Sequence, residues 1–237
     1  MKEILQSLEL ETFSAQREWL AEGIPVLRAE IALPCPTDKR NRIARRIHRF
    51  YQLQGRSYLR YCENWLAPKA AADCRLALAD SAPLPQYTAR LTYRVTCNQN
   101  GILSLHTDSH EYSGGRPLVL RHGDTWDLAG GYPLPITAFF PGRTPVRRQL
   151  LQTVSAEIRR QEAAGVARYR EDWPQALKRT FNRNHYYITP EELYVFWQMY
   201  AIAPAAEGIP AFALTFGNGP CVFPGSLPKK SDAPKSV

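Results

Sequence analysis

The stretch YTARLTYRVTCNQNGILSLHTDSHEY, residues 87–112, decides the fold. Two runs rich in β-forming residues flank Asn98-Gln99-Asn100-Gly101, and an Asn-Gly pair supplies the positive φ angles that a tight hairpin turn requires. SGGRP, residues 113–117, provides a second reversal, and a third hairpin is predicted where residues 117–128 and 132–140 flank Ala129-Gly130-Gly131. Successive reversals of this kind predict an antiparallel sheet.

The segments before this core predict a strand and a helix. VLRAEIALP, residues 26–34, alternates apolar and charged side chains, which is typical of a half-buried strand. Residues 2–22 predict a short helix, with Ile4, Leu5 and Leu8 on one side. Residues 39–54 place Ile43, Ile47, Phe50 and Tyr51 at helical spacing after a cap at Thr37 or Asp38. Gly55 and Pro68 then predict a kink and a stop.

The C-terminal half mixes helices and strands. Residues 145–163 predict an amphipathic helix, and residues 171–181 predict a shorter one. Strands are expected at 185–189, 192–202 and 209–216. The fold class is therefore α+β, an antiparallel sheet with amphipathic helices packed on one face.

The chain divides into four predicted parts. Residues 1–23 form an N-terminal segment, residues 24–86 the strand-helix part, residues 87–217 the sheet with inserted helices, and residues 218–237 a disordered polar tail.

Composition favours an intracellular location. The 237 residues carry five cysteines, an odd number without a C-x-x-C pair, which indicates free thiols in a reducing cytoplasm. Polar residues interrupt every apolar run near Met1, and no 18 consecutive residues are apolar. We therefore expect a cytoplasmic protein with no membrane partner and no cofactor. Its oligomeric state is open.

A metal site is one alternative for the chemistry of this chain. On a strand His106, Asp108 and His110 share a face, and this ligand set suits zinc or iron. Together with Asp124 they could serve a metal-dependent hydrolase acting on cell-wall-like glycans. The other interpretation is a polar, solvated sheet face.

Net charge provides a second alternative. The formal charge of +8 raises the chance of an acidic partner such as nucleic acid. The candidate contacts are Arg40, Arg42, Arg45, Arg46 and Arg49, which a solvated helix face would explain equally well.

The second half resembles a known domain family. HEYSGGRP, DTWDLAGGYPLPITAFF and HYYITPEELYVFWQMYAIAPAAEGIPAF occur in the order found in the C-terminal domain of RsiV-type anti-sigma factors, a domain also found beside PdaC-type polysaccharide deacetylases. The predicted strand 26–34, helix 38–60 and strand-turn-strand 87–112 resemble the companion N-terminal part of the same proteins, so the resemblance spans about residues 24–217. The matching positions are Tyr112, Gly114, Gly115, Asp127, Leu128, Gly131, Tyr200, Ile202, Ala203, Pro204 and Gly208.

This sequence departs from the family pattern at several positions, which limits the family properties that can be expected of it. Arg116-Pro117 stands where the family commonly has Ala-His, Ala201 where it has Glu, and Ala205 where it often has Tyr. Well-understood members are anchored in a membrane and sense lysozyme outside the cell. The resemblance implies the fold and a binding or sensing role without a recognised catalytic set.

The sequence thus predicts a non-catalytic binding module for an unknown protein or glycan ligand. Two loops, 112–117 and 200–208, form the predicted contact surface. The candidate ligand-binding residues are Tyr112, Gly114, Gly115, Arg116, Tyr200, Pro204 and Gly208.

Overall fold

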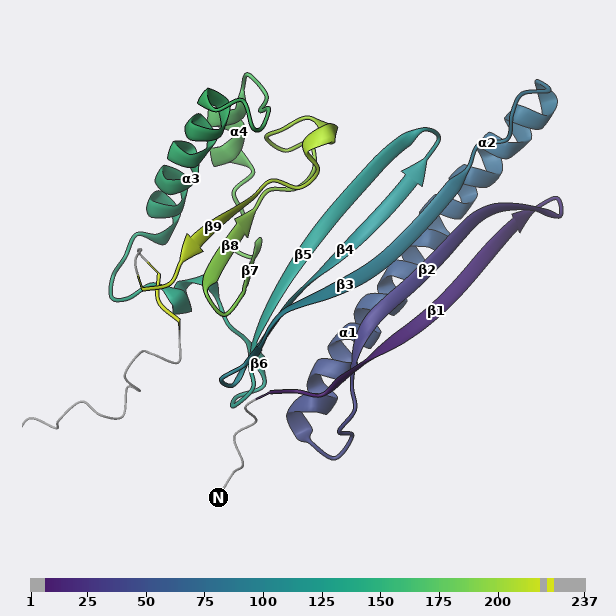
Figure 1. The fold of residues 1–237 in the computed structure, drawn as a ribbon. Coiled ribbons are helices and arrows are strands. Elements are labelled where there is room, and N and C mark those ends of the chain that lie inside the picture. The colour runs from purple at the N-terminus through teal and green to yellow at the C-terminus, as the bar shows by residue number, and fades with distance from the viewer. Residues whose placement is uncertain (1–6, 218–220, 224–237) are drawn as a thin grey trace, which may run out of the picture.

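A computed structural model describes residues 7–217 and 221–223 (Figure 1). Its larger sheet has six strands in the order β1-β2-β3-β4-β5-β6, and every neighbouring pair except β2–β3 is antiparallel. The strands are β1 (Leu10–Ala21), β2 (Ile24–Pro36), β3 (Tyr87–Gln99), β4 (Ile102–Ser113), β5 (Arg116–Asp127) and β6 (Tyr132–Pro133).

The two hairpins predicted first are confirmed. Asn100 and Gly101 join β3 to β4 with φ angles of 53° and 76°, and Gly114 and Gly115 join β4 to β5 with φ angles of 57° and 87°. The third is shorter than expected, because after β6 the chain turns into a 3₁₀ helix, Ile136–Phe139. Pro133 and Pro135 lack the N–H groups that a longer strand would need.

The predicted N-terminal helix is wrong within the described residues. The chain there forms β1, which pairs with β2 through a turn at Glu22 and Gly23, with φ angles of 53° and 82°. β1 is an edge strand whose side chains are mostly exposed, so it lacks the strict apolar alternation that marks a half-buried strand. Residues 2–6 lie outside the described residues.

The helix predicted at residues 39–54 is confirmed, but it is longer than expected. α1 (Arg42–Tyr61) continues through a π-helical segment (Cys62–Leu66) into α2 (Ala67–Ala79). Asn41 is the N-cap in place of Thr37 or Asp38, because its side chain accepts hydrogen bonds from the amides of Ile43 and Ala44 at 2.8 and 3.2 Å.

Neither Gly55 nor Pro68 acts as predicted. A Cβ on Gly55 would lie 3.0 Å from Cδ1 of Leu33, so this glycine allows α1 to pack closely on β2, and α1 runs unbroken through it. Pro68 stands in the first turn of α2, directly after the π segment, where a missing N–H is tolerated. The helix therefore continues past it.

This long helix explains the one parallel pair and the first core. β2 and β3 run parallel, so the chain between them must cross over, and α1 and α2 form that crossover. They cover one face of the six-stranded sheet, as expected, and bury the aliphatic side chains of β2, β3 and β4 (Figure 1).

A second sheet was not expected. Its strands are β7 (Tyr186–Ile188), β8 (Glu192–Phe196) and β9 (Ala211–Thr215), shorter than the predicted segments and all antiparallel. The predicted helices α3 (Val146–Ala163) and α4 (Trp173–Arg179) pack on this sheet, not on the larger one (Figure 1). The helices thus divide between two sheets.

β7 packs against β4 and β5 on the face that α1 leaves uncovered. The Ile188 amide donates to Oγ of Ser104 at 3.0 Å, and the carbonyl of Tyr186 lies where a Cβ on Gly123 would be, at 1.9 Å. The half of that face near Arg28 and Tyr112 remains open.

All five cysteines have free thiols in the structure. Cys221 is buried, and the next amide, of Val222, donates to the carbonyl of Phe139 at 2.8 Å. Most of the predicted disordered tail, 218–220 and 224–237, lies outside the described residues. Across the described ranges, no helix is both long and apolar enough to cross a bilayer.

Candidate functional site

The three predicted metal ligands share one face of β4, but their side chains have different partners. Nδ1 of His106 lies 3.1 Å from Oδ1 of Asp108, whereas the exposed His110 makes no such contact. Nε and Nη2 of Arg121 donate to the two carboxylate oxygens of Asp108 at 2.8 and 2.7 Å. The carboxylate that a metal would need is therefore held by a guanidinium.

The ionisation of Asp108 fits this pairing. Burial opposes the charge, but hydrogen bonds from Arg121 and then His106 outweigh it and hold the pKa of Asp108 well below its usual value. No group of three or more His, Cys, Asp or Glu side chains arranged to hold a metal occurs in residues 7–217 or 221–223. This geometry does not favour the metal alternative.

Aromatic rings enclose this ion pair. The Arg121 guanidinium lies 5.8 Å from the ring centre of Tyr187 and 5.9 Å from that of Phe196. The His106 ring lies 5.0 Å from Tyr187. Because Tyr187 and Phe196 belong to the second sheet, the cluster joins the two sheets and its role is structural.

The two predicted loops meet. Tyr200, with a φ angle of 68°, donates from its hydroxyl to the carbonyl of Pro117 at 2.7 Å. Nη1 of Arg170 donates to the Tyr200 carbonyl at 3.2 Å. Tyr200 thus lies beside the turn that carries Gly114, Gly115 and Arg116.

The other two loop residues serve a different turn. Pro204 and Gly208 flank the 3₁₀ turn Ala205–Glu207, and the Glu207 carboxylate accepts from the amide of Arg168 at 3.1 Å. A ligand-binding role for these loop residues remains a prediction.

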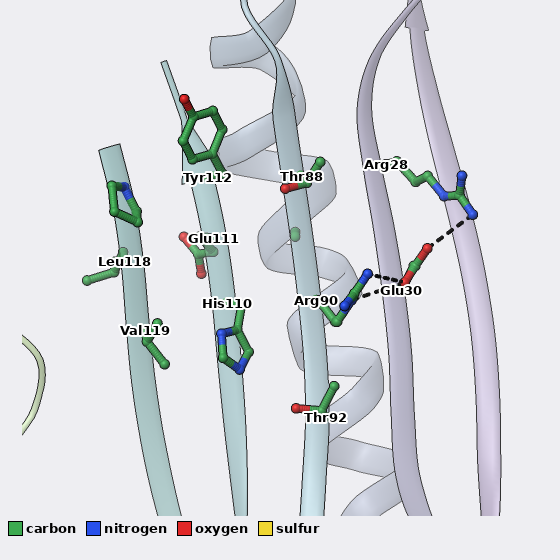
Figure 2. Close-up of a pocket in the computed structure, with 12 residues that line it drawn as sticks. Arg28, Glu30, Thr88, Arg90, Thr92, His110, Glu111, Tyr112, Leu118 and Val119 are labelled. Carbon is green, nitrogen blue, oxygen red and sulfur yellow. Dashed lines mark hydrogen bonds and ion pairs between the residues drawn. The ribbon is translucent and has the colours of Figure 1, made fainter. Parts of the chain in front are cut away.

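A groove lies on the open face of the larger sheet, beside Tyr112 and His110 (Figure 2). It crosses β2, β3, β4 and β5 and has a volume of about 590 Å³. Alternation along the strands produces it: Leu27, Ala29 and Ile31 point into the helix-covered core, so Arg28 and Glu30 point to the other face. Thr88, Arg90 and Thr92 do the same on β3.

Two arginines share one carboxylate at the edge of this groove. Nη2 of Arg28 lies 3.0 Å from Oε1 of Glu30, and Nη2 of Arg90 lies 3.1 Å from Oε2 (Figure 2). Both arginine side chains are more than half exposed. Two cationic groups against one anionic group leave an excess positive charge and several N–H donors facing the groove.

Arg28, Glu30 and Arg90 were not among the site residues predicted from the sequence. They occur as the polar positions of alternating strands, a pattern that by itself indicates only a solvated face. Their meeting depends on the parallel pairing that places Glu30 opposite Arg90. Recognising that the helix between residues 26–34 and 87–99 is a crossover would have predicted this neighbourhood.

A separate hydrogen-bond chain lies on the helix-covered face. The Trp126 Nε1 donates to the Tyr51 hydroxyl at 3.1 Å, which donates to Oδ2 of Asp124 at 3.2 Å. Nε2 of His122 lies 3.2 Å from Oδ1 of Asp124, and this hydrogen bond raises the pKa of His122. Asp124 therefore faces away from the predicted metal residues and binds α1 to β5.

Residues 138–217 match the profile of a family described as "Protein of unknown function (DUF3298)". No match was found among curated proteins.

Two crystal structures share the fold. One is a member of the same family from Bacteroides fragilis NCTC 9343, with 14% identity, a TM-score of 0.67, and coverage of 90% of this chain and 92% of that one. The other is a family protein from Pseudomonas aeruginosa PAO1, with 17% identity, a TM-score of 0.58, and coverage of 96% and 100%. At these identities the likeness concerns the fold.

Proposed function

We propose that this chain, whose residues 138–217 match a family of unknown function, is a non-catalytic binding module. Its ligand is an extended acidic polypeptide segment that lies in the groove of the open sheet face. The observation that carries the proposal is the pair Arg28 and Arg90, held in place by one shared carboxylate, Glu30.

Charge and geometry support an acidic ligand. Guanidinium groups bind carboxylates through paired N–H donors, and clusters of arginine are a recurring means of recognising acidic motifs. The Glu30 carboxylate orients both arginines and occupies only part of their donors. A ligand carboxylate can therefore bind without displacing it.

The size of the groove supports an extended segment. Four adjacent strands span roughly 14 Å between the outer two, and about four residues of extended chain cover that length. Hydroxyl groups of Thr88 and Thr92 line the floor and can bind the backbone of such a segment.

A peptide fits the lining better than a glycan. Among the described residues that line the groove, the rings are those of Tyr112 and His110, so the groove presents no row of rings for sugar faces. The lining therefore favours a peptide over a glycan as the ligand of this groove.

The test measures binding of a fluorescent hexaglutamate peptide to the full chain by anisotropy, with hexaglutamine as the neutral probe. We expect hexaglutamate to bind at least tenfold more tightly, and its affinity to fall as salt is raised. The double variant Arg28→Ala/Arg90→Ala should lose at least tenfold.

Two control variants and one further probe make the test decisive. The double variant Arg148→Ala/Arg159→Ala removes two exposed charges from α3, and Arg45→Ala/Arg49→Ala removes two from α1; neither should change the affinity. Equal binding of both peptides would overturn the proposal, as would a loss confined to the α1 variant. Binding of tetragalacturonate but not hexaglutamate would assign the groove to acidic glycans instead.

A further inference from the structure

The outer surface of α1 carries a row of arginines. Apart from the adjacent Arg45 and Arg46, successive members lie three, four or seven residues apart. This spacing places all of them on one broad face of a helix, opposite the buried Ala44, Ile47, Tyr51 and Gly55. Between the first and the last the helix rises about 27 Å. This arginine ridge consists of Arg42, Arg45, Arg46, Arg49, Arg56 and Arg60, all exposed.

The ridge has no counter-charge. α1 contains no Asp or Glu. Within the described part of the chain, no ion pair or side-chain hydrogen bond involves any of the six guanidinium groups. Like charges three or four residues apart destabilise a helix, so the uncompensated row suggests an external anionic partner.

The use of arginine and not lysine indicates which kind of anion the ridge binds. Every cation of the ridge is arginine and none is lysine. The planar guanidinium binds phosphate oxygens in pairs, whereas lysine acts as a point charge. A surface bearing many phosphates is therefore the best match.

Exposed apolar side chains near the ridge distinguish a phospholipid surface from a nucleic acid as the source of the phosphates. Leu53 lies on the same face of α1 as the arginine ridge and is 54% exposed. Trp65 in the π segment is 71% exposed. Leu76 on α2 is also largely exposed. A lipid interface would bury such side chains among headgroups and acyl chains, whereas a nucleic-acid backbone would leave them in water.

We propose that the arginine ridge docks the protein on an anionic phospholipid surface, with Leu53 and Trp65 entering the interfacial layer. This role is independent of the proposed function. It requires no spanning segment, because an interfacial helix lies in the plane of the membrane. In this orientation the groove, on the opposite face of the sheet, points away from the lipid.

The test is flotation of the full chain with vesicles of phosphatidylcholine alone or with 30% phosphatidylglycerol. We expect at least tenfold more protein on the anionic vesicles, and loss of most of that binding at high salt. Arg45→Glu/Arg49→Glu should abolish flotation, whereas Arg148→Glu/Arg159→Glu, an equal charge change on α3, should leave it unchanged.

Two further variants distinguish lipid from nucleic acid. Leu53→Ser and Trp65→Ser should weaken vesicle binding several-fold while keeping every charge, and neither should alter binding to a 20-base-pair duplex. Equal binding to both kinds of vesicle, or equal losses from the α1 and α3 variants, would overturn the inference. Tight duplex binding without vesicle binding would also overturn it. Circular dichroism of each variant checks that the fold is retained, and binding of hexaglutamate to Arg45→Glu/Arg49→Glu shows whether the groove remains functional.

Discussion

Arg121 on β5 and Asp108 on β4 are register partners, and the guanidinium of one donates two hydrogen bonds to the carboxylate of the other. The two side chains are 17% and 12% exposed, so water reaches them poorly. This pair, under the rings of Tyr187 and Phe196, fixes the junction of the two sheets.

We expect Asp108→Asn to lower the free energy of unfolding by about 2–3 kcal/mol at pH 7, because it leaves a buried guanidinium without its counter-charge. The folded-state pKa of Asp108 is depressed, so its contribution is complete above the ordinary pKa of about 3.9 and is lost as pH falls toward the folded-state value. Urea denaturation at pH 7 and at pH 3 measures both effects. If the free energies of unfolding of the variant and the wild type differed as much at pH 3 as at pH 7, this assignment would be contradicted. Glu157→Gln, which breaks an exposed pair on α3, should leave the urea midpoint unchanged.

Glu111 predicts the opposite pH dependence. Burial raises its pKa, and the hydrogen bond from Tyr61 offsets this only in part. A raised pKa means that the group contributes most below its unfolded value, near 4.3, and that this contribution is lost as pH rises. We expect Glu111→Gln to be more stable than wild type at pH 7 and equal to it at pH 3.5, as thermal melts will show. The exposed Glu11→Gln should match wild type at both values.

Gly123 is a position where a methyl group has no room. A Cβ would lie 1.9 Å from the carbonyl oxygen of Tyr186, a backbone atom that can move only if β7 leaves β5. Gly123→Ala should therefore cost more than about 3 kcal/mol. Gly55→Ala is the matched variant, since its Cβ would meet side-chain atoms alone, the end of Leu33 at 3.0 Å and Ile31 at 3.9 Å. We expect its urea midpoint to stay near that of wild type, and similar losses in both variants would refute the argument.

Gln198 closes the free edge of β5. Its side-chain oxygen accepts a hydrogen bond from the backbone N–H of Arg121 at 2.9 Å, and its side-chain nitrogen donates to the Arg121 carbonyl at 2.6 Å, as a neighbouring strand would. Gln198→Leu should speed hydrogen exchange of the Arg121 amide by roughly fivefold, which corresponds to about 1 kcal/mol for one hydrogen bond. NMR exchange resolves this amide. Unchanged exchange would show that the strand edge does not depend on the side chain.

Glu30 restrains the two arginines of the groove. Glu30→Gln removes the anionic charge that Arg28 and Arg90 share, so more of their donors and the full positive charge face the ligand. We expect hexaglutamate to bind several-fold more tightly to this variant, with a steeper dependence on salt. Glu162→Gln, an equal charge change at an exposed position of α3, should have no effect on the anisotropy titration.

Local sequence signals were sufficient for much of the fold. Asn100-Gly101 and Gly114-Gly115 determine tight reversals because few other residues adopt their positive φ angles, and the strands between them follow. The spacing of Ile43, Ile47 and Tyr51 likewise determines the buried side of α1. The α+β class could therefore be predicted.

The edge strand and the irregular helix could not be predicted from local sequence signals. β1 has one paired side and mostly exposed side chains, so its sequence carries little periodicity. Pro68 reads as a helix stop, yet a π segment placed just before it lets the helix continue. Both depend on neighbours that lie outside the local window.

The chain by itself determined its turns, its helical faces and its excess of positive charge, because these depend on residues close together in sequence. Tertiary structure alone decided which charges meet. Arg28, Glu30 and Arg90 come together only through the parallel β2–β3 register, and Arg121 takes the Asp108 carboxylate only through the β4–β5 register. Electrostatic interactions act through space, and the distances that set them come from strand pairing and packing.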